Sequence, residues 1–236
     1  MAVASTARAT RKQLGVRPAA PMAAPTAAVP VELGVTGLRH WAGHIDEEFL
    51  PELKFPKDVK VYREMESNDS TVGALLRAII LLVRGVEWRE EESDPQTPEE
   101  QLELVRTARQ DMSHTWEDFL AELFREMLAF GSAIHETVYK LRRPPQSRYA
   151  DGLLGWAKLP IRSRDTVSRW LLADNGDFRG IEQLAPPAYR LISIPAGKLL
   201  LFRAEPYKNN PEGRSLLRNS YRSWWFKKRI ENIEGI

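Results

Sequence analysis

The sequence contains no cysteine, carries almost no net charge and has no long hydrophobic run. The lack of thiols excludes disulfide frameworks and thiolate metal sites, and it fits folding in a reducing cytoplasm. The formal net charge is only +2, so nucleic-acid binding can be argued only from a local cluster of basic residues. The longest apolar run, from Ala78 to Val83, is far below the ~20 residues of a membrane span. We therefore expect a soluble protein without a membrane partner.

The usual catalytic motifs are also missing. The sequence has none of the patterns G-x-x-x-x-G-K-[ST], G-x-G-x-x-G, G-x-S-x-G and H-E-x-x-H, which hold phosphates, present a serine nucleophile or bind zinc. His114 stands beside a predicted helix cap and His135 inside a predicted strand, positions typical of ordinary hydrogen-bonded histidines. We therefore expect no enzyme, no cofactor and no metal site.

One pair of histidines leaves a metal-dependent hydrolase open as a third reading. His40 and His44 are four residues apart, which on a helix would put both side chains on one face. Gly43 between them argues against a stable helix. Metal analysis of chelator-free protein would test this reading. The carboxylates that would complete such a site follow directly: Asp46, Glu47 and Glu48.

The first thirty residues differ in composition from the rest. Residues 1–30 are rich in alanine and proline and include four basic side chains, and no acidic residue precedes Glu32. Four prolines interrupt the apolar stretch that a secretory signal needs, which leaves a transit peptide as the targeting alternative. Such a segment buries too little apolar surface to order itself. We predict a flexible basic tail over residues 1–30 and one domain over residues 31–236.

The domain is irregular until a helix begins near residue 69. Glycine and proline break the pattern between residues 31 and 69, where Val59–Tyr62 reads as a short strand. Apolar residues then recur every three or four positions, which predicts a helix that Asp69 or Ser70 caps and that Gly85 ends in the left-handed conformation. The recurring residues are Val72, Leu75, Leu76, Ile79, Ile80 and Val83.

Two more helices are predicted after a charged loop. Val86–Trp88 reads as a short strand and residues 89–96 as a solvated acidic loop. The capping-box pattern of Thr97–Glu100 starts a helix that runs to about Gln110.

The next helix has the clearest pattern in the sequence. Thr115 caps it, with Asp118 three residues on, and Gly131 ends it. Its apolar residues form one continuous stripe, which predicts packing in the core. They are Trp116, Phe119, Leu120, Leu123, Phe124, Met127 and Leu128.

Beyond Gly131 the hydrophobic period changes from 3.6 towards 2, which indicates strands. Thr166–Leu172 and Phe178–Leu184 are predicted to form a hairpin, because the Asn-Gly pair in the turn Asp174–Asp177 supplies positive φ angles. The run of apolar residues in Lys198–Arg203 predicts a strand that is buried on both faces. Helices, then antiparallel or mixed strands, then a C-terminal helix predict an α+β fold. The predicted strands are Ala133–Lys140, Leu153–Ile161, Thr166–Leu172, Phe178–Leu184 and Lys198–Arg203.

The C-terminal segment from Pro211 to Ile236 combines basic and aromatic residues. If the segment is one continuous helix, with 100° per residue, four of its arginines fall within about an 80° arc and have apolar residues on both flanks. These four are Arg214, Arg218, Arg222 and Arg229. This pattern suits a subunit interface, an acidic partner or a polyanion, and equally arginines that pair with the chain's own acids. The candidate contact residues are Arg214, Arg218, Arg222, Trp225, Lys227, Lys228 and Arg229.

At this point the residues match a known family. Residues Asn209–Arg218 and Tyr221–Lys228 read NNPEGRSLLR and YRSWWFKK, which resembles the NPxGxSxLR…YxxWxFK stretch of tailed-bacteriophage portal proteins. Further stretches fit the same family in the same order, so the resemblance covers roughly Leu33 to Ile236. These stretches are Tyr62–Met65 with Asn68–Leu75, Val86–Arg89 and Phe130–Glu136.

The resemblance implies a wing-like domain in a structural protein of the virion, the head-to-tail connector. Such proteins form a ring, typically a dodecamer, at one vertex of the capsid, and double-stranded DNA passes through the channel during packaging and ejection. The implied partners are other copies of the chain, the terminase large subunit that pumps the DNA, and capsid and head-completion or adaptor proteins. The implied location is the portal vertex, with assembly in the host cytoplasm. The portal itself hydrolyses nothing.

Family members usually continue beyond the helix at the end of this chain, into the stem, the clip and a crown-side region. We therefore expect this chain to correspond to the N-terminal portion of a portal protein. The alternative function is a free-standing nucleic-acid-binding module, in which the arginines grip phosphates and Tyr221, Trp224 and Trp225 stack on bases. A binding titration against salt concentration separates these two readings.

Overall fold

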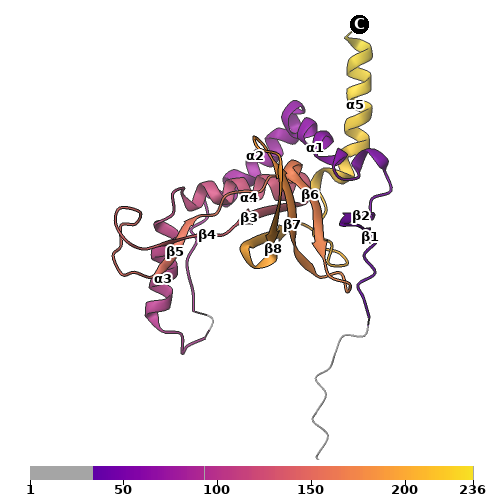
Figure 1. Cartoon of the computed structure of the whole chain (residues 1–236). Coiled ribbons are helices and arrows are strands. Elements are labelled where there is room, and N and C mark those ends of the chain that lie inside the picture. The colour runs from indigo at the N-terminus through magenta and orange to yellow at the C-terminus, as the bar shows by residue number, and fades with distance from the viewer. Residues whose placement is uncertain (1–33, 93, 236) are drawn as a thin grey trace, which may run out of the picture. The chain divides into compact units, whose positions relative to one another are not determined.

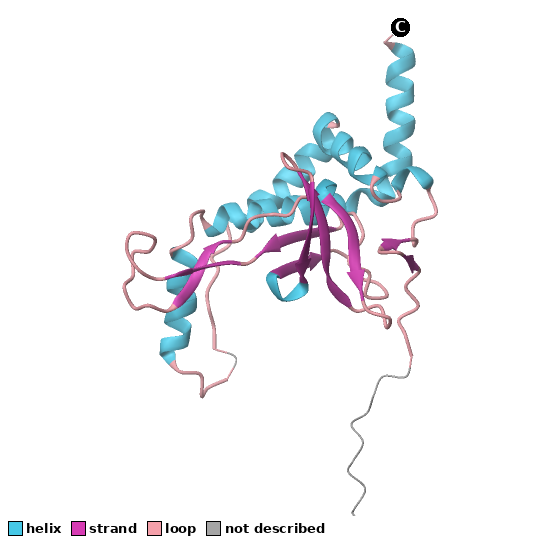
Figure 2. Ribbon diagram, in the orientation of Figure 1, coloured by secondary structure: helices cyan, strands magenta, loops and turns pink. Residues whose placement is uncertain are grey.

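The computed structural model describes residues 34–92 and 94–235 (Figure 1). The predicted tail of residues 1–30 lies outside the described residues, and the domain boundary after it stays a prediction. Helices precede a strand-rich block and one helix follows it, which confirms the α+β fold (Figure 2). The helices are α1 (Lys57–Asn68), α2 (Ser70–Arg84), α3 (Glu99–Gln110), α4 (Trp116–Phe130) and α5 (Tyr221–Glu234). The strands are β1 (His40–Trp41), β2 (His44–Ile45), β3 (Ser132–Glu136), β4 (Val138–Leu141), β5 (Leu154–Lys158), β6 (Val167–Leu172), β7 (Phe178–Ala185), β8 (Arg190–Pro195) and β9 (Leu199–Arg203).

Helix α1 replaces the strand predicted over Val59–Tyr62, so that prediction was wrong. Val59, Tyr62 and Met65 are all buried in one cluster, and their spacing of three residues places them on one side of a helix. The β-branched residues suggested a strand, but packing against α2 and α4 decides the conformation.

Helix α2 begins as predicted, and its end differs in detail. The Asp69 carboxylate accepts hydrogen bonds from the backbone N–H groups of Thr71 and Val72, which satisfies two donors at the helix start. Gly85 has a φ of −79°, so it is not left-handed. The helix ends where the Gly85 N–H bonds back to the carbonyls of Leu81 and Leu82.

The segment between α2 and α3 contains no strand among its described residues. Val86–Trp88 is mostly exposed and finds no neighbouring strand to pair with, so the predicted strand does not form. The acidic loop is only partly solvated, because the half-buried Glu90 lies 3.0 Å from Arg109.

Helix α3 ends at Gln110 as predicted but starts without the capping box. Pro98 occupies the cap position and no side chain caps the first turn. Asp94 orders the preceding turn instead, since its carboxylate accepts a hydrogen bond from the Gln96 N–H.

Helix α4 agrees with its prediction at both ends. The Thr115 hydroxyl accepts a hydrogen bond from the Asp118 N–H, and Gly131 ends the helix with a φ of +93°. Its apolar stripe contributes Phe119, Leu120 and Leu123 to the core.

The strands of the described residues form four small antiparallel sheets. The predicted strand Ala133–Lys140 divides near Thr137, so that β3 pairs with β9 while β4 pairs with β5. The predicted strand Leu153–Ile161 shortens to β5, and Ile161 keeps an isolated bridge to His135. The hairpin β6–β7 is confirmed, and β8 extends it to a three-stranded sheet.

Three details of the sheets differ from the sequence analysis. Strand β8 was not predicted, because its mostly exposed residues show no alternation of apolar and polar side chains. In the hairpin turn Gly176 alone has a positive φ, of 87°, while the Asn175 side chain accepts a hydrogen bond from the Asp177 N–H. Leu200 on β9 is exposed, so that strand is not covered on both faces.

A buried carboxylate links α3 to the β4–β5 hairpin. Asp111, directly after α3, lies 2.9 Å from the Lys140 ammonium on β4 and accepts a hydrogen bond of 2.7 Å from the Ser147 hydroxyl. Burial opposes ionisation of this carboxyl, yet these hydrogen bonds outweigh it and lower the pKa of Asp111 to about 2.

One glutamate on α4 makes stability depend on pH. Burial raises the pKa of Glu126 to about 7 from its ordinary 4.5, although Arg63 opposes the rise. Because the folded protein prefers the protonated carboxyl, this contribution to stability is full below pH 4.5 and is lost as the pH rises through 7. We expect Glu126→Gln to raise the free energy of unfolding by about 2 kcal/mol at pH 8 and to change it little at pH 4.

Urea denaturation at the two pH values measures this effect. Glu91→Gln, a change at an exposed loop position, is the matched control and should leave the pH dependence unchanged. An equal effect of Glu126→Gln at both pH values would show that folding does not raise the pKa of this carboxyl.

Candidate assembly site around the C-terminal helix

Two glycines bring the loop before α5 against the end of α4. Gly213, with a φ of +59°, faces Gly131 so closely that a Cβ on it would lie within 3.0 Å of the Gly131 and Ala204 carbonyl oxygens. The Ser215 hydroxyl donates a 2.6 Å hydrogen bond to the carbonyl of Ala129 at the end of α4. This contact fixes where the chain enters α5.

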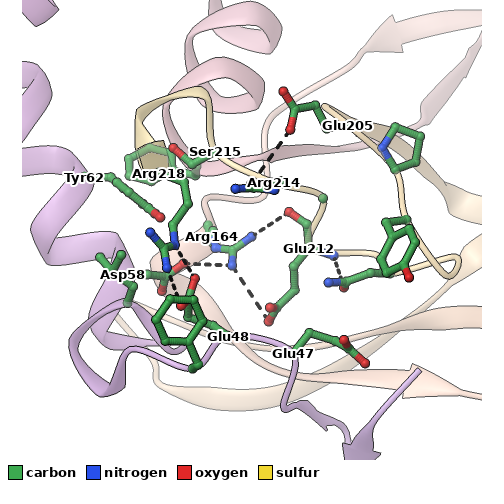
Figure 3. Close-up of a pocket in the computed structure, with 17 residues that line it drawn as sticks. Glu47, Glu48, Asp58, Tyr62, Arg164, Glu205, Glu212, Arg214, Ser215 and Arg218 are labelled. Carbon is green, nitrogen blue, oxygen red and sulfur yellow. Dashed lines mark hydrogen bonds and ion pairs between the residues drawn. The ribbon is translucent and has the colours of Figure 1, made fainter. Parts of the chain in front are cut away.

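Beneath that loop lies a buried ion cluster centred on Arg164. The Arg164 guanidinium donates a 2.9 Å hydrogen bond to Asp58 on α1 and a 3.1 Å bond to the Ser132 hydroxyl on β3. The Glu212 carboxylate lies 3.8 Å from Arg164 and accepts a 3.1 Å hydrogen bond from the Trp170 indole. The cluster therefore joins α1, the sheets and the loop before α5 (Figure 3).

Burial controls the protonation of this cluster. Burial alone would lower the pKa of Arg164, but Asp58 and Glu212 outweigh it and raise that pKa. Burial raises the pKa of Glu212 in spite of Arg164, and burial together with Asp58 raises the pKa of Tyr62 to about 12. Removing the guanidinium would leave two carboxyl groups in a poorly solvated place.

A cavity of about 550 Å³ lies beside the cluster, lined by charged side chains from α1, the β2–α1 segment and the loop before α5. Across it, the Arg218 guanidinium donates two hydrogen bonds to the Glu48 carboxylate, of 2.5 Å and 2.8 Å. The side-chain hydrogen bond from Arg218 and the charge of that guanidinium lower the pKa of Glu48, although burial opposes this. Arg218 is thus paired within the chain (Figure 3).

The predicted row of four arginines does not lie on one α-helix. Residues Leu216–Ser220 form a 3-10 turn and α5 begins at Tyr221. Arg214 precedes this turn, and Arg218 lies within it and pairs with Glu48, so neither shares the α-helical face of Arg222 and Arg229. Arg214 is half exposed and lies 3.9 Å from Glu205.

One side of α5 is docked on the rest of the domain. Tyr221 is buried and Trp224 packs against the same cluster, which also contains α1 and α2 residues. Lys227 donates a 2.8 Å hydrogen bond to Asp69, and Lys228 pairs with Glu64. These contacts join the first two turns of α5 to α1 and to the start of α2.

The opposite side of α5 remains uncovered by any described residue. Arg222 lies over the Phe226 ring and Arg229 over the Trp225 ring, and neither arginine has a carboxylate partner in residues 34–92 and 94–235. Phe226 and Trp225 are exposed as well. This side offers a surface of basic, aromatic and aliphatic side chains.

The histidines take no part in this site. His40 and His44 lie in the paired strands β1 and β2 rather than on a helix, and the described residues contain no group of three potential metal ligands. His135 is fully buried, its Nδ1 is 2.8 Å from the Leu159 carbonyl, and burial lowers its pKa. No helix in the described part of the chain is long and apolar enough to cross a bilayer.

The sequence analysis missed the three charged residues at the centre of the cluster. Arg164 and Asp58 lie in segments without a motif, 106 positions apart. Glu212 falls inside the stretch NPEG, but nothing in its spacing shows that it is buried. A local pattern does not reveal charges that meet only when the sheets and α1 pack.

A family model described as the portal protein of Mu bacteriophage matches residues 59–231, far more than half of the chain. The chain belongs to the phage portal protein family. The matched range includes most of α1, all of α2 to α4, all strands from β3 to β9 and most of α5, so the portal assignment rests on most of the described fold. It identifies a structural protein of the phage virion, of the head-to-tail connector class.

Two solved particles contain chains of similar structure to this portal protein. A chain in the virion of a native gene transfer agent particle has 12% sequence identity and a TM-score of 0.49, covering 73% of this chain and 44% of its own length. A chain in the neck of an empty gene transfer agent particle has 11% identity and a TM-score of 0.49, covering 73% and 45%. The portal chain described here thus spans less than half the length of the solved chains that it matches. A search of curated proteins found no match.

Proposed function

We propose that this portal protein forms a homo-oligomeric ring at one capsid vertex, through which double-stranded DNA is packaged and ejected. The observation that carries the proposal is the uncovered side of α5, where Phe226 and Trp225 are exposed beside Arg222 and Arg229. Exposed aromatic and arginine side chains are enriched in protein interfaces. The family membership supplies the partner class, a second copy of the portal chain.

The domain is proposed to act as a wing that carries α5 in a fixed direction. The Arg164 cluster and the paired glycines hold the loop before α5, and Lys227 and Lys228 hold its first turns. A rigid base is what a ring needs, because small angular errors between subunits prevent closure. Terminase, capsid and adaptor proteins are the further proposed partners. Residues 31–236 are the proposed wing-like domain.

A free-standing nucleic-acid-binding module receives less support from the charges. Of the seven candidate residues, Arg218, Lys227 and Lys228 are engaged with carboxylates of the same chain. Paired cations release fewer counterions from DNA, so they add less to affinity. We therefore propose that the DNA passes through the ring without tight, fixed binding by these side chains.

Sedimentation velocity and negative-stain imaging test this proposal. We expect the purified chain to self-associate and to show rings or ring segments, and the double variant Trp225→Ser/Phe226→Ser to stay folded but to associate at least about tenfold more weakly. Tyr207→Ser, another exposed aromatic position, is the control. A monomer that binds short DNA tightly, with a steep salt dependence that Arg222→Ala reduces, would support the nucleic-acid module instead.

A further inference from the structure

Helix α3 and strand β5 pack side by side (Figure 1), and a cleft of about 610 Å³ lies between α3 and the chain that connects β4 to β5. Arg142 is the one basic side chain among the residues that line it. None of its lining residues belongs to the assembly site around α5. The carboxylates that line this acidic cleft are Glu99, Glu100 and Glu103 of α3 and Asp151 of the β4–β5 connection.

The acidic cleft carries more negative charge than the described chain neutralises. Glu103 pairs with Arg106 at 2.7 Å, and Asp151 pairs with Arg142 at 3.0 Å. Glu99 and Glu100 are exposed and pair with no cation of residues 34–92 and 94–235. A cation that enters the cleft is therefore attracted by two carboxylates without displacing a partner. Because acidic residues in a first turn also complement the helix dipole, these two alone identify no ligand.

A buried arginine in the wall of the acidic cleft indicates what else the ligand offers. Arg142 is 3% exposed. Its terminal nitrogens contact the Thr107 hydroxyl and Asp151, each at 3.0 Å, and its guanidinium lies over the Tyr149 ring. Its Nε N–H is buried and has no acceptor among the residues that the structure describes. A buried donor without an acceptor is unfavourable, and the backbone carbonyl of a bound peptide would supply one.

Apolar side chains lie beside these charges. Leu104 and Tyr149 are half-buried, and Leu153 is 49% exposed. Carboxylates next to aliphatic and aromatic groups suit a peptide in which basic and apolar residues are mixed. A bare metal ion fits less well, since the described residues contain no group of three potential metal ligands. DNA is excluded as the occupant because an acidic surface repels phosphates.

The portal chain itself contains a segment of this chemistry. Residues 1–31 include no Asp or Glu and form the longest acid-free stretch of the sequence. Arg17 precedes Gly34, the first described residue, by 17 positions, and an extended chain of that length spans up to about 60 Å. Alanine, leucine and valine stand between its cations. These cations are Arg8, Arg11, Lys12 and Arg17.

From this charge complementarity we propose that the acidic cleft binds the basic N-terminal segment of the portal chain, residues 8–17. Glu99 and Glu100 attract its arginine and lysine side chains, and the Arg142 Nε donates a hydrogen bond to one of its backbone carbonyls. Cations held in the cleft are neutralised and release fewer counterions from DNA, so the contact limits non-specific binding of the segment to DNA. The inference goes beyond the proposed ring and does not depend on it.

Limited trypsin digestion of the full chain tests this contact, because trypsin cleaves after Arg8, Arg11 and Lys12. We expect Glu99→Gln/Glu100→Gln to speed cleavage at these sites by at least about threefold. Salt at about 0.5 M should bring the unchanged protein to the rate of the variant, since it screens exposed charges. Glu91→Gln/Glu92→Gln, in the exposed loop before α3, is the matched control. Equal rates for the unchanged protein and the cleft variant would overturn the proposal.

A labelled peptide of residues 6–18 measures the same contact by fluorescence anisotropy. Its binding partner is the full chain with glutamine in place of the four cations of its own segment, which then does not compete. We expect saturable binding that Glu99→Gln/Glu100→Gln weakens by at least about threefold and that Glu91→Gln/Glu92→Gln leaves unchanged.

Two results contradict the inference without touching the proposed ring, which imaging tests separately. The first is no binding of the peptide to the chain with the neutralised segment. The second is tryptic cleavage that only short duplex DNA slows and that the cleft variant does not change, which would assign the segment to nucleic acid instead.

Discussion

Replacing Arg164 with methionine is expected to lower the free energy of unfolding by about 3–5 kcal/mol, the range for removing one partner of a buried ion pair. The guanidinium is buried, lies 2.9 Å from Asp58 and 3.8 Å from Glu212, and also bonds the Ser132 hydroxyl. Methionine fills a similar volume but leaves both carboxyl groups without a cation. Urea denaturation at pH 7, followed by tryptophan fluorescence, measures the loss.

Two comparisons isolate the charge effect. Arg169→Met removes an arginine on β6 that forms an exposed pair with Glu182 on β7. It should have little effect, because exposed pairs contribute little. Adding Asp58→Asn and Glu212→Gln to Arg164→Met should recover a large part of the lost stability. If the triple variant is no more stable than Arg164→Met, lost packing and not unpaired charge explains the effect.

Acid should weaken the effect of Arg164→Met. Burial already raises the pKa of Glu212 in the unchanged protein, so this carboxyl is neutralised early as the pH falls. A buried carboxyl that is neutral is destabilised little by the loss of the guanidinium. We therefore expect the stability difference between the variant and the unchanged protein to be smaller at pH 4.5 than at pH 7.

The second large effect is expected for Gly213→Ala, which should lower the free energy of unfolding by about 3 kcal/mol or more. Its positive φ of 59° disfavours any Cβ, and the added carbon would lie within 3.0 Å of the Gly131 and Ala204 carbonyl oxygens. Relief of that overlap requires the loop to move away from α4, which breaks the hydrogen bond from Ser215 to Ala129. Thermal unfolding followed by circular dichroism measures the loss.

Gly197→Ala is the matched control for this substitution. Gly197 lies in a 3-10 turn, and a Cβ there would meet nothing within 4 Å. We expect it to be neutral or slightly stabilising, because alanine restricts the unfolded chain. Equal stability of the Gly213→Ala protein and the unchanged protein would show that the loop has room to move and does not fix α5. Weaker self-association of a still-folded Gly213→Ala protein would show that the loop sets the direction of α5.

The local features of the fold were predictable because they depend on neighbouring residues. The Thr115 cap, the stripe of α4 and the end at Gly131 all agree with the structure, as does the hairpin β6–β7. Predictions failed where packing overrides a weak local preference. Val59–Tyr62 became helical against α2 and α4, and the chain from Ala133 to Lys140 divided between two sheets.

The site was predictable in composition but not in geometry. The sequence analysis selected Arg218, Lys227 and Lys228 as candidate contacts, and the structure places carboxylates of the same chain beside all three. Those carboxylates are Glu48, Asp69 and Glu64, more than 150 positions away in the sequence. Charges that are so far apart in sequence are brought together by tertiary packing. The spacing of residues along one helix cannot predict such pairs.

The sequence by itself determined the α+β class, the caps at Asp69, Thr115 and Gly131, and the membership of the portal family, because each depends on short-range patterns or on matched motifs. The tertiary structure alone decided which charges are buried and which faces of α2 and α5 are uncovered. The physical reason is that burial is a property of contacts between distant segments. An apolar helix face has the same sequence pattern whether the chain covers it, as at Leu76 of α2, or leaves it exposed, as at Leu75 and Leu82.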